Sequence, residues 1–80
     1  MIKVFSDNGR VWVLEVTGDT VKFYDARFEQ TDLGQFVSSY YIDTVLEVDG
    51  GLCLDGGVPY WSIGPDTMTR IKTWLQGLSN

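Results

Sequence analysis

The sequence predicts a single α+β domain, residues 1–80, in which an antiparallel sheet of about five strands packs against one or two helices. Three observations lead to this fold class. The first twenty-five residues alternate β-prone segments with glycine turns, the middle of the chain has apolar residues at helical spacing, and the last part has an apolar stripe after a Gly-Pro-Asp start. The expected order of elements is strand-strand-strand-helix-strand-strand-helix.

The first three strands are expected to form an antiparallel meander. They cover Ile2–Phe5, Arg10–Thr17 and Val21–Asp25, and Asn8-Gly9 and Gly18-Asp19 supply the turns between them. The second strand carries apolar residues on both sides, which indicates a central strand that is covered on one face and partly covered on the other. Because an isolated hairpin is only marginally stable, this meander needs a covering element.

The middle of the chain predicts a helix over Leu33–Val48. Asp32 is expected to cap its N-terminus with Gln35 as the capping-box partner, and Asp49-Gly50-Gly51 is expected to end it. The alternative is a strand over Gln35–Tyr41, because the aromatic and β-branched residues of this segment also suit a sheet. The two cap signals favour the helix.

A second hairpin is expected from Leu52–Asp55 and Val58–Ile63, with Asp55-Gly56-Gly57 as its turn. Pro59 must lie at an edge or at the start of its strand, because it cannot donate a hydrogen bond to a ladder. Cys53 has no basic neighbour that would activate its thiol, so we expect it to be a small buried hydrophobe.

The last helix is expected to begin at Gly64-Pro65-Asp66, since proline suits the first helical position and an acid suits the first turn. Its buried stripe is expected to comprise Met68, Ile71, Leu75 and Leu78, with Trp74 beside it. Arg70 and Lys72 are expected on the far side of the helix.

Charge is distributed unevenly along the chain. Residues 29–69 contain seven acids and no Lys or Arg, a charge of −7, whereas the two ends together carry +2, so the net charge of −5 arises in the middle of the chain. All six basic residues lie in the two ends. Such an asymmetry bears on partners and solubility rather than on fold. Direct binding of nucleic acid is disfavoured, because it requires a basic patch.

The residue types present exclude several classes of chemistry. The chain has no histidine and a single cysteine, which removes the commonest general base, the Ser-His and Cys-His dyads and a zinc site. No calcium-loop or phosphate-loop spacing occurs. A carboxylate pair for glycoside hydrolysis is the remaining enzymatic alternative, and a chain of this length without an evident cleft argues against it. We therefore expect no catalytic residue, no metal, no cofactor and no enzymatic activity.

The expected partner-binding residues are four acids and two tyrosines: Asp43, Glu47, Asp49, Asp55, Tyr41 and Tyr60. Asp43 and Glu47 share a face of the expected helix. Carboxylates on an unbroken negative surface would enter a Lys/Arg groove that normally holds nucleic acid. Exposed tyrosines would act as anchors, since they dominate interface hot spots. The simpler interpretation of the acids is a solvated helix face and turn-forming aspartates.

Two runs and the overall character of the chain carry a resemblance to known proteins. The runs Gly34–Tyr41 and Gly51–Pro59 are similar to segments of small hypothetical proteins of bacterial mobile elements, and the short, acidic, single-domain chain resembles the phage-encoded anti-CRISPR proteins. No diagnostic motif underlies this resemblance, so no functional residue is transferred. The resemblance implies an inhibitor of a type I system, with subtype I-C as the expected target. It would bind the crRNA-guided surveillance complex at its basic DNA-binding face and block target DNA by mimicking it.

An alternative from another class is a non-enzymatic interaction module of a phage or mobile element. Such a module would bind another protein through its aromatic surface, and the acids would serve solubility only. In both cases we expect a protein partner, no direct contact with nucleic acid or membrane, and a monomer or a weak dimer through an exposed sheet edge. The chain shows no secretory signal and no apolar run long enough to span a bilayer, so the cytoplasm of the host bacterium is the expected location.

Overall fold

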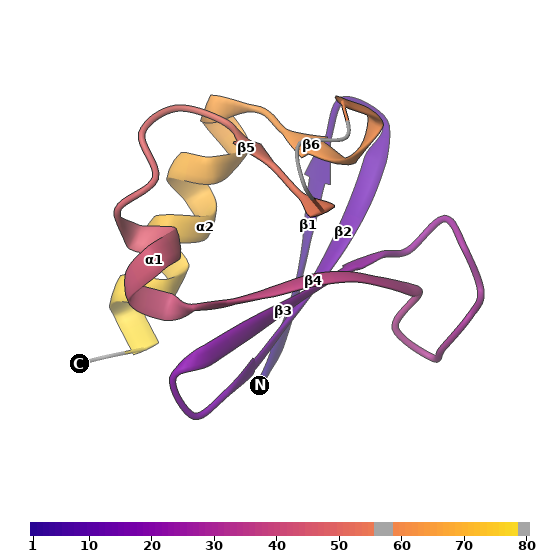
Figure 1. Ribbon diagram of the computed structural model, residues 1–80, viewed down its shortest axis with the longest axis horizontal. Helices are drawn as coiled ribbons and strands as arrows, with labels where there is room; N and C mark the ends of the chain where they lie inside the picture. Colours follow the sequence, from indigo (N-terminus) through magenta and orange to yellow (C-terminus); the bar gives the residue numbers. More distant parts are fainter. Residues whose placement is uncertain (56–58, 79–80) are drawn as a thin grey trace.

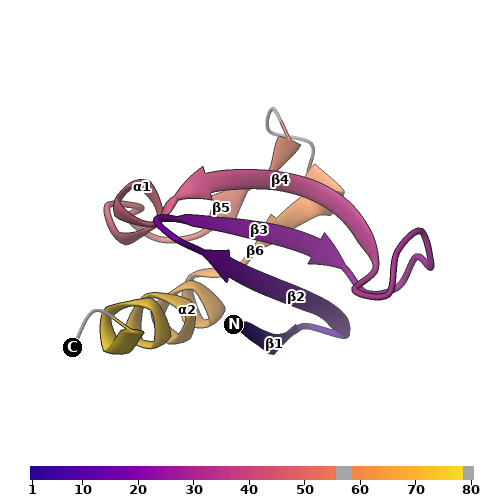
Figure 2. The same cartoon turned by 90° about the horizontal axis from the view of Figure 1, so that it is seen from below.

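A four-stranded antiparallel sheet forms the larger part of the structure, a computed structural model that describes residues 1–55 and 59–78 (Figure 1). Its strands follow each other in chain order: β1 (Ile2–Asp7), β2 (Arg10–Thr17), β3 (Thr20–Asp25) and β4 (Gln35–Tyr41). Figure 2 shows this order, with α1 following directly on β4. The predicted α+β class with an antiparallel sheet is confirmed.

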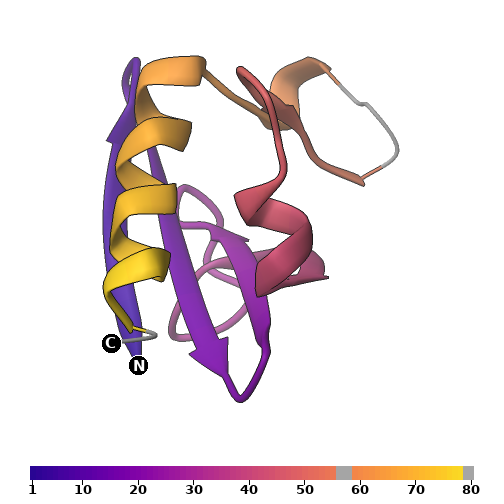
Figure 3. The same ribbon diagram turned by 90° about the vertical axis from the view of Figure 1, so that its left-hand side faces the viewer.

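One face of the sheet carries all the covering elements. These are α1 (Ile42–Leu46), a small second sheet of β5 (Leu52–Cys53) and β6 (Ser62–Ile63), the 3-10 helix η2 (Pro59–Trp61), and α2 (Pro65–Leu78). Figure 3 shows α2, coloured from orange to yellow, running alongside β1, with α1 on its other side. The buried core joins these elements through Phe5, Trp12, Leu14, Val21, Phe23, Val37, Val45, Leu54, Ile63, Met68, Ile71 and Leu75.

The predicted meander is confirmed. Asn8 and Gly9 both have positive φ, 48° and 82°, as the favoured two-residue hairpin turn requires. Trp12 and Leu14 are fully buried, and Val13 on the opposite side of the same strand is also buried. The central position of β2 explains this pattern, because β1 and β3 shield it on both sides.

The predicted helix over Leu33–Val48 is wrong for most of its length. The alternative strand, Gln35–Tyr41, is β4, and only Ile42–Leu46 is helical. Asp32 caps no helix; Thr31 closes the loop instead, where the Leu33 N–H donates to its Oγ1 at 3.1 Å. The local cap signals are overridden because β4 pairs along its whole length with β3, which local spacing does not reveal.

The second hairpin is confirmed in part. β5 pairs with β6 through Leu52↔Ile63 and Cys53↔Ser62, so both strands are shorter than expected, and Pro59 begins η2 rather than lying in a strand. The predicted turn falls largely on residues 56–58, which lie outside the described residues. Cys53 is exposed, so its expected burial is wrong. Cys53 faces outward from β5, and the next residue, Leu54, which follows the strand, lies in the core.

The last helix is confirmed from Pro65 onward. Met68, Ile71 and Leu75 are buried, and Trp74 packs edge-on against Phe5 with ring centroids 5.8 Å apart. The N-terminus of α2 is fixed from β1, where the Asp7 carboxylate accepts hydrogen bonds from Gly64 N (3.2 Å) and Thr67 Oγ1 (2.8 Å).

The basic residues of α2 do not both lie on a free far side. Lys72 is half-buried, and its Nζ donates to the Val48 carbonyl at 2.6 Å. Arg70 is exposed and donates to the Ser6 carbonyl at 2.8 Å. Each of these cations therefore ties α2 to another segment.

Asp25, at the end of β3, is a buried carboxylate with 1% of its surface exposed. It accepts three hydrogen bonds from the side chain of Arg27, at 2.7 to 3.3 Å, and one from the Trp61 indole Nε1 at 3.2 Å. Burial alone would raise the pKa of Asp25, but the hydrogen bonds and positive charge of Arg27, together with the Trp61 hydrogen bond, outweigh it and lower that pKa. The carboxylate thus joins the sheet to the β5–β6 segment.

We expect Asp25→Asn to lower the free energy of unfolding by about 2 kcal/mol at pH 7, because it removes a charged acceptor from a buried cluster. Since the folded-state pKa lies below the unfolded value, this stabilisation is present above about pH 4 and is lost as the pH falls through the folded pKa. Urea unfolding at pH 7 and pH 3 should therefore show a difference between the two proteins that shrinks at pH 3. Asp43→Asn, at an exposed site, is the control. Equal stability of Asp25→Asn and the unaltered protein at pH 7 would contradict this role.

We expect Gly34→Ala to destabilise the fold by about 2 kcal/mol or more. Gly34 has a φ of +117°, and a Cβ there would overlap the Asp25 carbonyl oxygen and lie 2.8 Å from the Ala26 Cα. Gly77→Ala is the matched control: that site in α2 has open space, so alanine should stabilise the helix by about 0.5 kcal/mol. Thermal unfolding of both variants measures the difference in their stability. Equal stability of Gly34→Ala and Gly77→Ala would mean that the close approach of Gly34 to Asp25 does not require glycine.

Candidate functional site

Three predicted acids follow one another along α1 and the segment after it. Asp43 lies in the first turn of α1, and Glu47 is its C-cap residue, whose N–H donates to the Asp43 carbonyl at 3.2 Å. They are therefore one turn apart, as predicted, although the helix is short. Asp49 follows two residues later, and all three residues are exposed. The ion pair of the described residues joins Arg27 to Asp25, so none of these three acids is ion-paired within that part of the chain.

Lys72 brings one positive charge to the C-terminal end of this acidic segment through its hydrogen bond to the Val48 carbonyl. The absence of Lys and Arg between residues 29 and 69 therefore overstates the negative charge there. Asp43, at the start of α1, lies at the opposite end of this segment from Val48.

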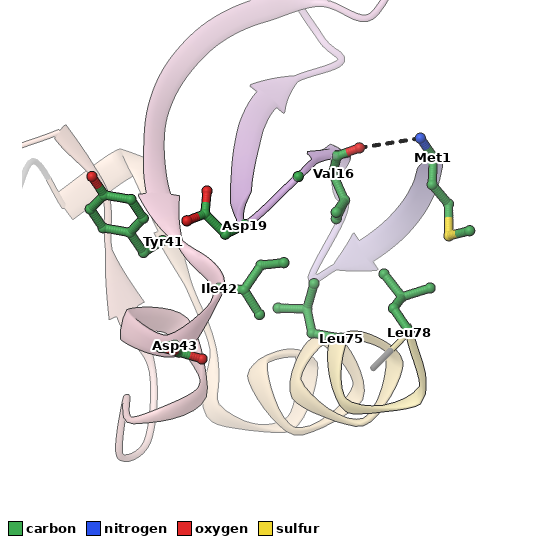
Figure 4. A pocket seen from close by; sticks show the side chains of 9 residues that line it. Met1, Val16, Asp19, Tyr41, Ile42, Asp43, Leu75 and Leu78 are labelled. Carbon is green, nitrogen blue, oxygen red and sulfur yellow. Dashed lines mark hydrogen bonds between the residues drawn. The ribbon is translucent and has the colours of Figure 1, made fainter. Parts of the chain in front are cut away.

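A pocket of about 500 Å³ opens beside the start of α1 (Figure 4). Four elements form it: the start of β1, the β2–β3 turn, the junction of β4 with α1, and the end of α2. Its apolar lining includes Val16, Ile42, Leu75 and Leu78. Asp19, Tyr41 and Asp43 also line it, and Figure 4 places these three on the side opposite Met1.

Tyr41 is the more exposed of the two adjacent tyrosines, with 63% of its surface exposed. Tyr40 is half-buried and packs edge-on against Phe23, with ring centroids 5.8 Å apart. The difference follows from strand alternation, because Tyr40 faces the core from β4 and Tyr41 faces away. The exposure of Tyr41 makes it available as an anchor, which is the role predicted for it.

The six predicted residues do not form one cluster. Tyr41 and Asp43 meet at the pocket, and Glu47 and Asp49 continue from it along the chain. Asp55 and Tyr60 belong to the β5–β6 segment, which Figures 1 and 3 show apart from α1. Tyr60 is 57% exposed and rests against Trp61, with ring centroids 5.3 Å apart.

Asp19 is the residue that sequence reasoning missed, since it reads as a turn residue between two strands. The structure places it at the pocket because its carbonyl accepts a hydrogen bond from the Ile42 N–H at 2.8 Å. This bond fixes the β2–β3 turn against the first residue of α1. Only the pairing of β4 with β3 brings the two segments together, and that pairing joins residues far apart in the sequence.

The open face of the sheet carries a second feature. Val4, Val13, Tyr24 and Phe36 are successive cross-strand partners, so they form one row across all four strands. We call this the apolar row. Val4 is 56% and Phe36 46% exposed, and the Phe36 ring meets Tyr24 edge-on at 5.7 Å. The Tyr24 hydroxyl donates to Glu15 Oε1 at 3.1 Å; burial, with the hydrogen bond and charge of Glu15, raises the pKa of Tyr24.

Within residues 1–55 and 59–78, no group of three or more Asp, Glu or Cys side chains is placed to hold a metal ion. In that same part of the chain, no helix has the length and apolar character needed to cross a membrane.

Comparison with known proteins returned no match of the chain to a family model, to a curated protein or to a solved structure.

Proposed function

We propose that this chain is a non-enzymatic inhibitor that binds a protein partner through the acidic segment of α1 and the adjoining pocket. The partner has a basic surface that normally holds nucleic acid, and a type I CRISPR surveillance complex, with subtype I-C first, is the proposed target. Occupation of that surface in the bacterial cytoplasm would block target DNA. The observation that carries the proposal is the meeting of exposed Asp43 with exposed Tyr41 at a pocket that Asp19 also lines.

The chemistry of this surface supports binding rather than catalysis. Its carboxylates are exposed, and no described side chain forms an ion pair with them, so they are free to face a partner's cations. A complementary charge pattern steers such an encounter, and an exposed aromatic ring beside it supplies apolar contact. The strongly hydrogen-bonded carboxylate, Asp25, is instead buried and paired with Arg27, which suits a structural role.

We expect the double variant Asp43→Lys/Glu47→Lys to lose inhibition by about tenfold or more, since it reverses two rim charges that face a basic partner. Both side chains are exposed, so the fold should be retained. The measurement is a DNA mobility-shift assay, in which a purified subtype I-C surveillance complex binds target DNA in the presence of increasing amounts of each protein.

Glu29→Lys/Asp32→Lys is the matched control. It changes the net charge by the same amount, but both residues are exposed in the loop between β3 and β4, which projects away from α1 in Figure 1. Equal loss in both double variants would mean that overall charge alone matters. If the unaltered protein at large excess leaves DNA binding unchanged in surveillance complexes of all type I subtypes, the proposed target is wrong.

The apolar row favours a second candidate function, an interaction module that binds a protein through an apolar and aromatic surface. Two of the four residues of this row, Val4 and Phe36, are exposed, whereas the other two are buried. Exposed apolar residues that share one sheet face are typical of a surface that binds a partner. The ionisable residues next to it in register, Glu15 and Lys22, have opposite charge, so this face is close to neutral.

The two functions differ in their response to salt. A complex formed through the acidic segment should weaken strongly between 0.1 and 0.5 M NaCl, values chosen because the Debye length falls from about 10 Å to about 4 Å over that range. A complex formed through the apolar row should persist at high salt and be lost in Val4→Thr/Phe36→Thr, because threonine is more polar than either residue and still suits a strand. Pull-down of the tagged protein from a CRISPR-bearing lysate at both salt concentrations separates the two. Phe28→Ser is the control variant, because Phe28 is an exposed aromatic residue that lies outside both the pocket and the apolar row.

A further inference from the structure

The pocket beside α1 has an apolar interior that is large enough for a side chain. Its volume of about 500 Å³ lies within the range of ligand sites, and Val16, Ile42, Leu75 and Leu78 give it apolar walls. Leu75 is fully buried beneath it and belongs to the core, so one wall is fixed by packing. An apolar group that enters the pocket is therefore removed from water on several sides.

The rim of the pocket is negatively charged on one side. Asp19 and Asp43 come from different elements, and the hydrogen bond from Ile42 N to the Asp19 carbonyl, 2.8 Å long, holds these elements together. Both residues are exposed, and neither is ion-paired among the residues that the structure describes. Figure 4 shows the exposed Tyr41 ring on the same side of the pocket, with Asp19 beside it and Asp43 at the start of α1, and an aromatic ring also attracts cations.

The positive charge that lines the pocket is the α-ammonium of Met1, which donates to the Val16 carbonyl at 3.3 Å. Figure 4 places it across the pocket from the two aspartates. No Lys or Arg is among the residues that line the pocket. The side formed by Asp19, Tyr41 and Asp43 is thus suited to a cation, and the interior is suited to an aliphatic chain.

We propose that the pocket binds an aliphatic chain that ends in a cation, the chemistry of a lysine or arginine side chain of the partner. The chain packs against Ile42 and Leu78, and the cation lies at the carboxylates of Asp19 and Asp43 beside the Tyr41 ring. This inference rests on the proposed function in one respect: it takes the ligand to be a side chain of the basic partner. It adds the residue Asp19 and an inserted anchor to that proposal.

The ligand class is testable without the partner by three small probes of equal chain length: n-hexylammonium, n-hexanoate and 1-hexanol. Each is titrated into the isotope-labelled protein at pH 7, and NMR shifts of the Ile42 and Leu78 methyl groups are followed. We expect n-hexylammonium to bind with a dissociation constant of the order of millimolar, as its few atoms allow. It should bind about tenfold more tightly than n-hexanoate, with 1-hexanol between them.

Variants then assign the charge preference to residues. Asp19→Asn/Asp43→Asn should weaken n-hexylammonium binding about fivefold and leave 1-hexanol binding unchanged, since the volume is kept and only charge is lost. Glu47→Gln/Asp49→Asn, a pair of neighbouring acids that do not line the pocket, should change neither. Three outcomes would overturn the inference. The first is equal binding of n-hexylammonium and n-hexanoate, and the second is no shift with any probe at 20 mM, a concentration of the order of ten times the expected constant. The third is unchanged n-hexylammonium binding in Asp19→Asn/Asp43→Asn.

Failure of this inference is distinguishable from failure of the proposed function. If the n-hexylammonium preference is found but no type I surveillance complex is inhibited, the pocket retains its ligand class and the proposed target is wrong. If a surveillance complex is inhibited equally by the unaltered protein and by Asp19→Asn/Asp43→Asn, the inhibitor function stands and the anchor does not enter this pocket.

Discussion

The buried carboxylate of Asp25 is the interaction on which much of the described structure depends. It lies where three segments meet: the end of β3, the loop after β3 with its Arg27, and η2 with its Trp61. Burial of a charge costs free energy unless hydrogen bonds and an opposite charge compensate for it. Here the guanidinium of Arg27, which is partly exposed, and the indole N–H of Trp61 compensate for the buried carboxylate. The backbone of the same residue meets Gly34, just before β4 begins. One residue thus positions the loop, the start of β4 and the β5–β6 segment.

The parts of the fold that local signals determine are those that could be predicted. The first three strands and α2 have their turns, starts and apolar stripes within a few residues, and the structure agrees with them. β4 could not be predicted in the same way. Asp32 and Gln35 present a capping-box pattern, yet Gln35 pairs with Asp25 in the sheet, because pairing along a whole strand outweighs one local cap.

The candidate site shows the same division. The exposure of Asp43 and Glu47, which lie one turn apart, agrees with the pattern in the chain, whereas the exposure of Tyr41 rather than Tyr40 depends on the phase of β4. The pocket does not follow from that pattern, because its walls come from four elements that are distant in sequence, and Asp19 joins it through a backbone hydrogen bond to Ile42. Lys72 shows the opposite error: a count of charges by position placed it away from the acids, and folding brings its ammonium to the end of the acidic segment.

The irregularity in the pairing of β3 with β4 determines what the insertion or deletion of a residue in β4 would do. The register shifts between Phe23 and Tyr24. Phe23 pairs with Ser38 and Tyr24 pairs with Phe36, so Val37 is an additional residue in β4. A β-bulge of this kind reverses which side each later residue faces. The segment after Val37 is therefore phased so that Tyr40 faces inward and Tyr41 outward. A substitution in this segment leaves that phase unchanged. The loss or gain of a single residue would reverse it, so that Tyr41 would face the core and Tyr40, which contacts Phe23, would face solvent.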